Sequence, residues 1–91
     1  MAELLKASGD IKIVNPKEGK TFSLKELQEY VGGFIETISS LDGNHIMVVN
    51  EEGKLMGLPF NYCATIRLIN EFSKMDHIVG DALICRCNEI E

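Results

Sequence analysis

A short helix with a marked start and a marked stop is the most definite element of this sequence. Ser23 and Glu26 form a capping box, in which the hydroxyl and the carboxylate satisfy free backbone amides at a helix start. Apolar residues then recur at helical spacing, at Leu24, Leu27, Tyr30 and Val31. Gly32 and Gly33 end the helix, because glycine adopts the left-handed conformation without a clash. The pattern predicts an amphipathic helix over residues 24–31.

Strand patterns lie on both sides of this helix. Short runs of apolar or β-branched residues, bounded by turn residues, predict strands over residues 10–15, 34–39, 45–50, 54–58 and 78–87. Gly80 and Asp81 interrupt the last of these strands. Residues 41–44 and 50–54 have the composition of tight turns.

A second helix is predicted over residues 62–73. Asn61 caps it, since its side-chain oxygen reaches free amides of the first turn. The spacing places Ile66, Ile69 and Phe72 on the buried face, and Leu68 lies on a flank.

Two helices among about five strands, many joined by tight turns, predict an α+β fold with a mainly antiparallel sheet of four to five strands. No repeat, linker or low-complexity tract divides the 91 residues. We therefore expect a single domain over residues 1–91.

The charge balance and composition exclude several classes of protein. Nine Lys and Arg against 14 Asp and Glu give a formal net charge of −5. Because the cations are few and scattered, we expect no nucleic-acid partner, which would need clustered Lys and Arg. A hydrophobic fraction of 45% argues against disorder. No apolar run approaches the ~20 residues that cross a bilayer, so we expect no membrane partner.

The cysteines favour a cytoplasmic protein. Cys63, Cys85 and Cys87 are an odd set without the framework spacing of secreted, disulfide-rich domains. The first ten residues lack the apolar stretch of a secretory signal. We expect reduced thiols and a cytoplasmic location.

No combination of residues predicts catalysis or a cofactor. Cys85 and Cys87 fall on one face of a strand, but a single C-x-C pair is a weak zinc signal, and buried packing is favoured. His45 and His77 belong to no recognisable catalytic set. The glycines form no phosphate-binding loop ahead of a helix. We therefore expect no catalytic residue, no metal and no cofactor.

The segment 57–61 is the strongest candidate for binding. A rigid proline lies between apolar residues and precedes the free amides of a helix start, which attract anions. A plain strand-to-helix connection with an asparagine cap is the competing interpretation. The residues that we expect to contact a ligand at or beside this rim are Asn50, Lys54, Leu58, Pro59, Asn61 and Arg67.

Three ordered motifs point to a known family. They read VGGFIE from Val31, VNEEGKLMGLPFN from Val49 and DHIVGDALI from Asp76. In this combination the chain resembles a family of small domains of unknown function carried by bacteriophages, prophages and conjugative elements, over about residues 11–85. The resemblance implies an accessory protein of a mobile element that acts by stoichiometric binding. It brings no assigned catalytic or binding residues.

These observations lead to a functional hypothesis. We expect a non-enzymatic homo-oligomer that sequesters a small ligand, for example a host nucleotide signal, as an accessory or anti-defence factor. The alternative is an inhibitor that binds and occludes a host enzyme. Mimicry of DNA is disfavoured, since the acids are interleaved with lysines. An enzyme that relies on Cys63 or on a carboxylate is the least favoured hypothesis.

Overall fold

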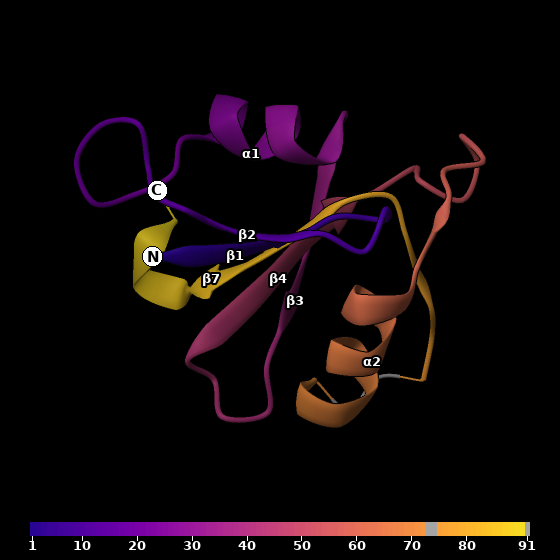
Figure 1. Ribbon diagram of the computed structural model, residues 1–91. Helices are drawn as coiled ribbons and strands as arrows, with labels where there is room; N and C mark the ends of the chain where they lie inside the picture. Colours follow the sequence, from indigo (N-terminus) through magenta and orange to yellow (C-terminus); the bar gives the residue numbers. More distant parts are fainter. Residues whose placement is uncertain (73–74, 91) are drawn as a thin grey trace.

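The computed structural model describes residues 1–72 and 75–90. The chain forms a five-stranded sheet, a two-stranded sheet and two α-helices (Figure 1). In chain order the elements are β1 (Ala2–Leu5), β2 (Ile11–Val14), α1 (Leu24–Val31), β3 (Ile35–Ser39), β4 (His45–Asn50), β5 (Phe60–Asn61), α2 (Tyr62–Glu71), β6 (Ile78–Val79), β7 (Ala82–Arg86) and a 3-10 helix, η1 (Cys87–Glu89). The large sheet has the order β2-β1-β7-β4-β3, and every pairing in it is antiparallel. The predicted α+β class is confirmed.

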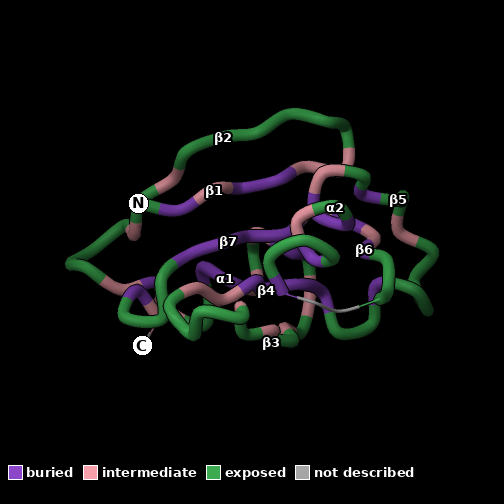
Figure 2. The backbone as a smooth tube through the Cα atoms, turned by 90° about the horizontal axis from the view of Figure 1, so that it is seen from below, coloured by how far each residue is buried: buried purple, intermediate pink, exposed green. Residues whose placement is uncertain are grey.

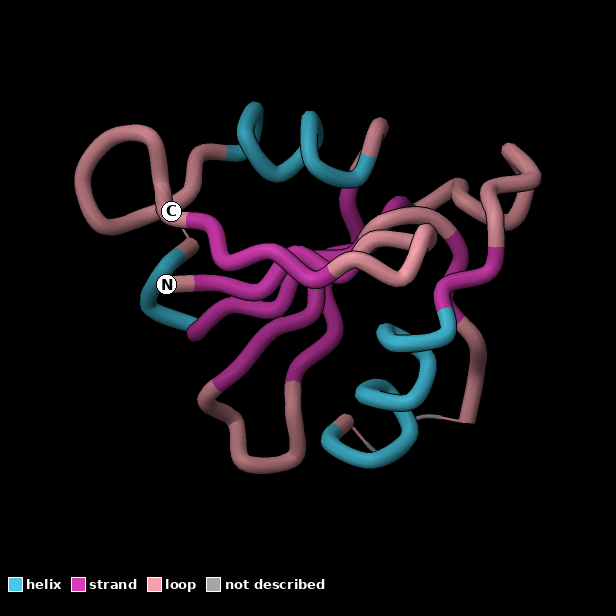
Figure 3. Tube along the Cα trace, viewed as in Figure 1, coloured by secondary structure: helices cyan, strands magenta, loops and turns pink. Residues whose placement is uncertain are grey.

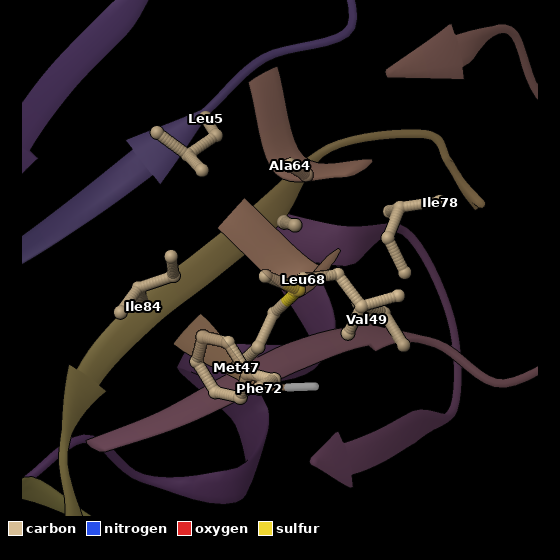
Figure 4. Close-up of a cluster of buried hydrophobic side chains, with 9 residues drawn as sticks. Leu5, Met47, Val49, Ala64, Leu68, Phe72, Ile78 and Ile84 are labelled. Atoms are coloured by element: carbon tan, nitrogen blue, oxygen red, sulfur yellow. The ribbon is translucent and has the colours of Figure 1, made fainter. Parts of the chain in front are cut away.

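The two helices cover opposite faces of the large sheet (Figure 1). Alternate residues of a strand point to opposite faces, so each face contributes to its own apolar core. On the α1 side, Phe22 and Leu27 pack with Val48. On the α2 side, Leu68 packs with Met47 (Figure 4). Within the described ranges, no helix is long and apolar enough to cross a bilayer.

Helix α1 is confirmed at both ends. The Ser23 hydroxyl accepts a hydrogen bond from the Glu26 amide, and the Glu26 carboxylate accepts one from the Ser23 amide, both at 3.2 Å. Gly32 has a φ of +80°, and its amide donates to the Gln28 carbonyl at 2.8 Å. The buried Glu26 carboxylate also accepts from the Lys17 amide at 2.7 Å. The cap therefore fixes the loop before the helix as well.

Helix α2 is confirmed with its Asn61 cap, and Phe72 is buried as predicted, but the predicted burial of Ile66 and Ile69 is wrong. Ile66 and Ile69 are 41% and 38% exposed. The side chains that face the sheet are Ala64, Thr65, Leu68 and Phe72. Apolar residues recur at helical spacing on the predicted face and also on the observed face of this helix. The helix places the observed face, which includes the small Ala64, against the sheet. The predicted end at Ser73 lies outside the described residues, and the observed helix ends at Glu71.

Strand β1 is an inner strand of the large sheet and is absent from the predicted strands. It pairs with β2 on one edge and with β7 on the other. Alanine, glutamate and leucine favour helices when considered alone, but pairing on both edges and burial on both faces override that preference. Leu4 joins the core on the α1 side, and Leu5 joins the core on the α2 side. The N-terminal residues are thus an integral part of the sheet.

The strand predicted over residues 54–58 is wrong, because this segment forms a projecting loop between β4 and β5 (Figure 3). The Met56 amide donates to the Glu52 carbonyl at 2.9 Å, and the Gly57 amide donates to the Lys54 carbonyl at 3.2 Å. These bonds coil the chain on itself and leave Leu55 88% exposed. The strand that follows is β5, which pairs with β6 instead of joining the large sheet.

The predicted break in the last strand is confirmed at Gly80, which separates β6 from β7. Gly80 has a φ of +76°, and a Cβ there would lie 2.7 Å from Leu58 Cδ1. We expect Gly80→Ala to lower the free energy of unfolding by about 2 kcal/mol, since it adds a contact clash to backbone strain. Gly19→Ala is the matched control, because Gly19 also has a positive φ but no atom within 4 Å. Urea denaturation should show a loss of about 1 kcal/mol for the control, and equal losses would contradict the Leu58 contact.

Candidate functional site

A cleft of about 230 Å³ opens beside β3, at one edge of the large sheet. Segments far apart in the sequence form it: the strands β3 and β4, the 51–57 loop, helix α2 and residues 76–79. Two other hollows, of about 360 and 450 Å³, are more open to solvent. The smaller cleft is therefore the best-enclosed of these three candidate sites.

The floor of the cleft is apolar. Val49, Leu68 and Ile78 line it, and all three also belong to the core on the α2 side (Figure 4). Ile38 packs against the same core and completes this floor. A floor that is part of the packed core holds its shape without a ligand, as binding sites for small molecules usually do.

The rim of the cleft is charged and predominantly acidic. Among the lining residues that the structure describes, three carboxylates, from Glu36, Glu51 and Asp76, face the ammonium of Lys54. Lys54 Nζ donates to Asp76 Oδ1 at 2.7 Å. This hydrogen bond, together with that from the His77 amide, lowers the pKa of Asp76. The lysine that the described residues contribute to the cleft is thus already paired.

His77 stands at the mouth of the cleft beside an aromatic ring. Its Nδ1 lies 3.5 Å from Asp76 Oδ1. Its imidazole stacks on Phe60, with ring centroids 6.1 Å apart and an interplanar angle of 29°. Both side chains are largely exposed, so the pair presents a flat surface next to the rim.

The Asn50 side chain joins the 51–57 loop to the C-terminal end of helix α1. Its Nδ2 donates to the Val31 carbonyl at 3.1 Å, and its Oδ1 accepts from the Glu52 amide at 2.8 Å. A Cβ on Gly33 would lie 3.0 Å from Asn50 Nδ2, so glycine gives the amide its space. The loop that carries Lys54 is therefore placed by a buried side chain.

The structure brings two of the six predicted ligand residues, Asn50 and Lys54, into the cleft lining. Leu58 packs against Gly80 instead, and the exposed Pro59 uses its carbonyl to accept the Gly80 amide at 2.7 Å. The predicted rim is therefore a connection that anchors the Gly80 turn, next to the cleft rather than inside it.

Asn61 and Arg67, the other two predicted residues, have partners within the protein. Asn61 is fully buried; its Nδ2 donates to the carbonyls of Leu5 and Gly80, both at 2.8 Å, and its Oδ1 accepts from the Ala64 amide at 3.0 Å. The Arg67 guanidinium binds two carboxylates, from Glu3 and Glu71. Desolvation opposes the charge on Arg67, but these two hydrogen-bonded carboxylates outweigh it and raise the arginine pKa.

The cysteines are dispersed and free. Cys85 is buried, and desolvation raises the pKa of its thiol to about 11. Cys87 lies in η1 rather than in the strand and is exposed, whereas Cys63 is half-buried. Among residues 1–72 and 75–90, no group of three or more His, Cys, Asp or Glu side chains is placed to hold a metal ion.

The sequence comparison adds a family to this geometry. A family model described as a domain of unknown function, DUF3846, matches residues 5–91. The chain belongs to the DUF3846 family. The match extends beyond the expected region of residues 11–85 and includes the end of β1 and η1. No curated protein and no solved structure matches the chain.

The three motifs of this DUF3846 chain meet around the cleft. The motif that begins at Val31 meets the motif that begins at Val49 where Gly33 contacts Asn50. The motif that begins at Val49 meets the motif that begins at Asp76 at two contacts, Gly53 with Val79 and Leu58 with Gly80. A Cβ on Gly53 would come within 3.0 Å of Val79 Cγ2. Close packing therefore accounts for these glycines, and the cleft is formed where the motifs join.

Sequence reasoning missed most of the cleft in this DUF3846 chain. Glu36, Glu51 and Asp76 were not among the expected ligand residues, because each belongs to a different segment. The available signal was that all three lie inside the three sequence motifs of this chain. Their convergence depends on how β3, the loop and residues 76–79 pack together.

Proposed function

We propose that the chain is a small non-enzymatic binding protein that holds one small molecule in the cleft, and that it serves a bacteriophage or other mobile element as an accessory or anti-defence factor. The observation that carries the proposal is the cleft itself, with an apolar floor joined to the core and polar groups around its rim. Such a combination is typical of ligand sites. The resemblance of the three motifs to domains carried by mobile elements supports this biological setting.

The charges of the rim indicate the class of ligand. Glu36 and Glu51, the carboxylates beside the Lys54–Asp76 ion pair, attract an ammonium or a guanidinium, and the apolar floor favours a hydrophobic body. Within the described part of the lining, a phosphate would meet those carboxylates with Lys54 as its cation, and Lys54 is bound to Asp76. We therefore infer an amine-bearing small molecule in preference to the nucleotide that was the first expectation.

Thermal shift with matched probes tests this inference. We expect 2-phenylethylamine to raise Tm and phenylacetate, which has the same ring with the opposite charge, to leave Tm unchanged. At about ten times Kd the amine should stabilise the fold by about 1.4 kcal/mol and raise Tm by about 8 °C. AMP provides the nucleotide arm of the experiment. Stabilisation by AMP alone would support a nucleotide ligand, and no shift with any probe would count against the cleft as a site.

A double variant links the effect to the rim. Glu36→Gln with Glu51→Gln removes two charges while keeping the shape, and we expect it to abolish the shift caused by the amine. Glu18→Gln with Glu29→Gln removes the same charge from exposed positions outside the cleft. An equal loss of the shift in both double variants would show a general charge effect and not a site.

A second candidate function, occlusion of a host protein, is favoured by an exposed apolar surface. Phe34, Leu55 and Met56 are 64%, 88% and 55% exposed. Phe34 and Met56 line the open hollow of about 450 Å³ near the loop. Solvent-exposed apolar patches of this kind often mark protein contacts. Capture of a defined host protein by the wild type, with loss of capture in Leu55→Asp/Met56→Asp, would support this function.

A further inference from the structure

Strand β2 forms an outer edge of the large sheet, and within the described residues it pairs with β1 alone (Figure 2). The Lys6 amide donates to the Asp10 carbonyl at 2.9 Å. Because bonded and non-bonded pairs alternate along an antiparallel ladder, Lys12 continues the bonding to β1. The N–H and C=O groups of Ile11 and Ile13 therefore point outward from the sheet.

The side chains of this edge are unusually apolar for an unpaired strand. Ile11 and Ile13 are 56% and 58% exposed, on the sheet face that also carries α2. The isoleucines of the opposite edge strand, Ile35 and Ile38 of β3, are instead partly buried against the cores. An exposed apolar edge with free backbone groups is a template for pairing with another strand.

We propose that β2 pairs antiparallel with β2 of a second copy, which joins the two five-stranded sheets into one continuous sheet. The charged residues on the other face of the β2 edge, Asp10 and Lys12, favour a second copy of this chain as the partner strand. With Ile11 opposite Ile11 of the second copy, Asp10 lies opposite Lys12 of the second copy, and the pair is repeated by symmetry. A register centred on Lys12 would place two lysines opposite each other, which is unfavourable.

The proposal goes beyond the proposed function and does not depend on it. The edge at β2 and the cleft beside β3 lie at opposite ends of the strand order. Pairing through β2 therefore leaves both clefts of a dimer open. Failure of ligand binding and failure of dimerisation are separate results.

Sedimentation equilibrium over a concentration series measures the dimer Kd of the wild type and of variants in which the charges at positions 10 and 12 are reversed. Lys12→Asp alone and Asp10→Lys alone each place like charges opposite one another, and we expect each to raise the dimer Kd about tenfold. The double variant Asp10→Lys/Lys12→Asp restores opposite charges, and we expect its Kd to return to within about threefold of the wild type. Circular dichroism checks that the variants fold, since both residues are exposed on an edge.

Each outcome decides the proposal. A monomer at every concentration overturns it, as does a dimer whose Kd is unchanged by Lys12→Asp. A dimer weakened by both single variants and not rescued by the double variant overturns the register with Ile11 at its centre. Weakening followed by rescue supports it.

Discussion

Replacing Asn61 by alanine is expected to lower the free energy of unfolding by about 3 kcal/mol. Its side chain makes three hydrogen bonds in a fully buried position, to β1, to the Gly80 turn and to the first turn of α2. Alanine leaves two carbonyls and one amide without partners, at about 1–3 kcal/mol for each buried group before relaxation. Loss of a helix cap alone costs about 1 kcal/mol. Urea denaturation with an unchanged m-value measures the loss.

Two further variants of asparagine positions sharpen this test. Asn70→Ala changes an exposed asparagine of the same helix, and we expect an effect within about 0.5 kcal/mol. Asn61→Asp keeps an oxygen to cap the Ala64 amide but removes the two donors to Leu5 and Gly80, so it should remain strongly destabilising. A loss below about 1 kcal/mol in Asn61→Ala would contradict the three-way role of this side chain.

Phe22→Ala is expected to cost about 4 kcal/mol, the usual range for removing a large buried aromatic side chain. Phe22 is 0% exposed, and its ring meets the Tyr30 ring edge-on with centroids 6.2 Å apart. Its backbone also joins the end of the chain, since its amide donates to the Glu89 carbonyl at 2.6 Å and it bridges to Ile90. The cavity would lie where α1, the sheet and the C-terminal segment meet.

Phe34→Ala is the matched control for this prediction. It makes the same chemical change at a ring that is 64% exposed, and we expect a loss within about 1 kcal/mol. Unfolding of both variants is followed by urea titration. Similar losses at the two positions would show that Phe22 is not a principal core residue.

The parts of the fold that local chemistry determines could be predicted from the sequence. The capping box at Ser23 and the glycine at position 32 act within α1 itself, so both ends of that helix were predictable. Strand β1 was not, because its helix-favouring residues are held extended by β2 and β7. The turn predicted over residues 50–54 is present, but the strand predicted over residues 54–58 was wrong, because the coiling of the 51–57 loop depends on Asn50, whose side chain bonds back to Val31.

The candidate site was less predictable than the fold. Asn50 and Lys54 lie in one motif with Glu51 and could be named from sequence, but the other two carboxylates, Glu36 and Asp76, come from β3 and from the segment before β6. Asn61 was predicted both as the cap of α2 and as a ligand contact. The cap is confirmed, and burial with three internal partners gives this side chain a structural role. Sequence position alone does not distinguish these two uses of an asparagine.

Amide chemical-shift mapping of the ¹⁵N-labelled protein, titrated with 2-phenylethylamine, tests the central claim most directly. We predict saturable shifts concentrated at Glu36, Glu51, Lys54 and His77, the polar rim of the cleft. We also predict that phenylacetate causes no comparable shifts at these amides. Absence of saturable shifts, or shifts concentrated at Phe34 and Met56 in the open hollow, would contradict a small-molecule site in the cleft.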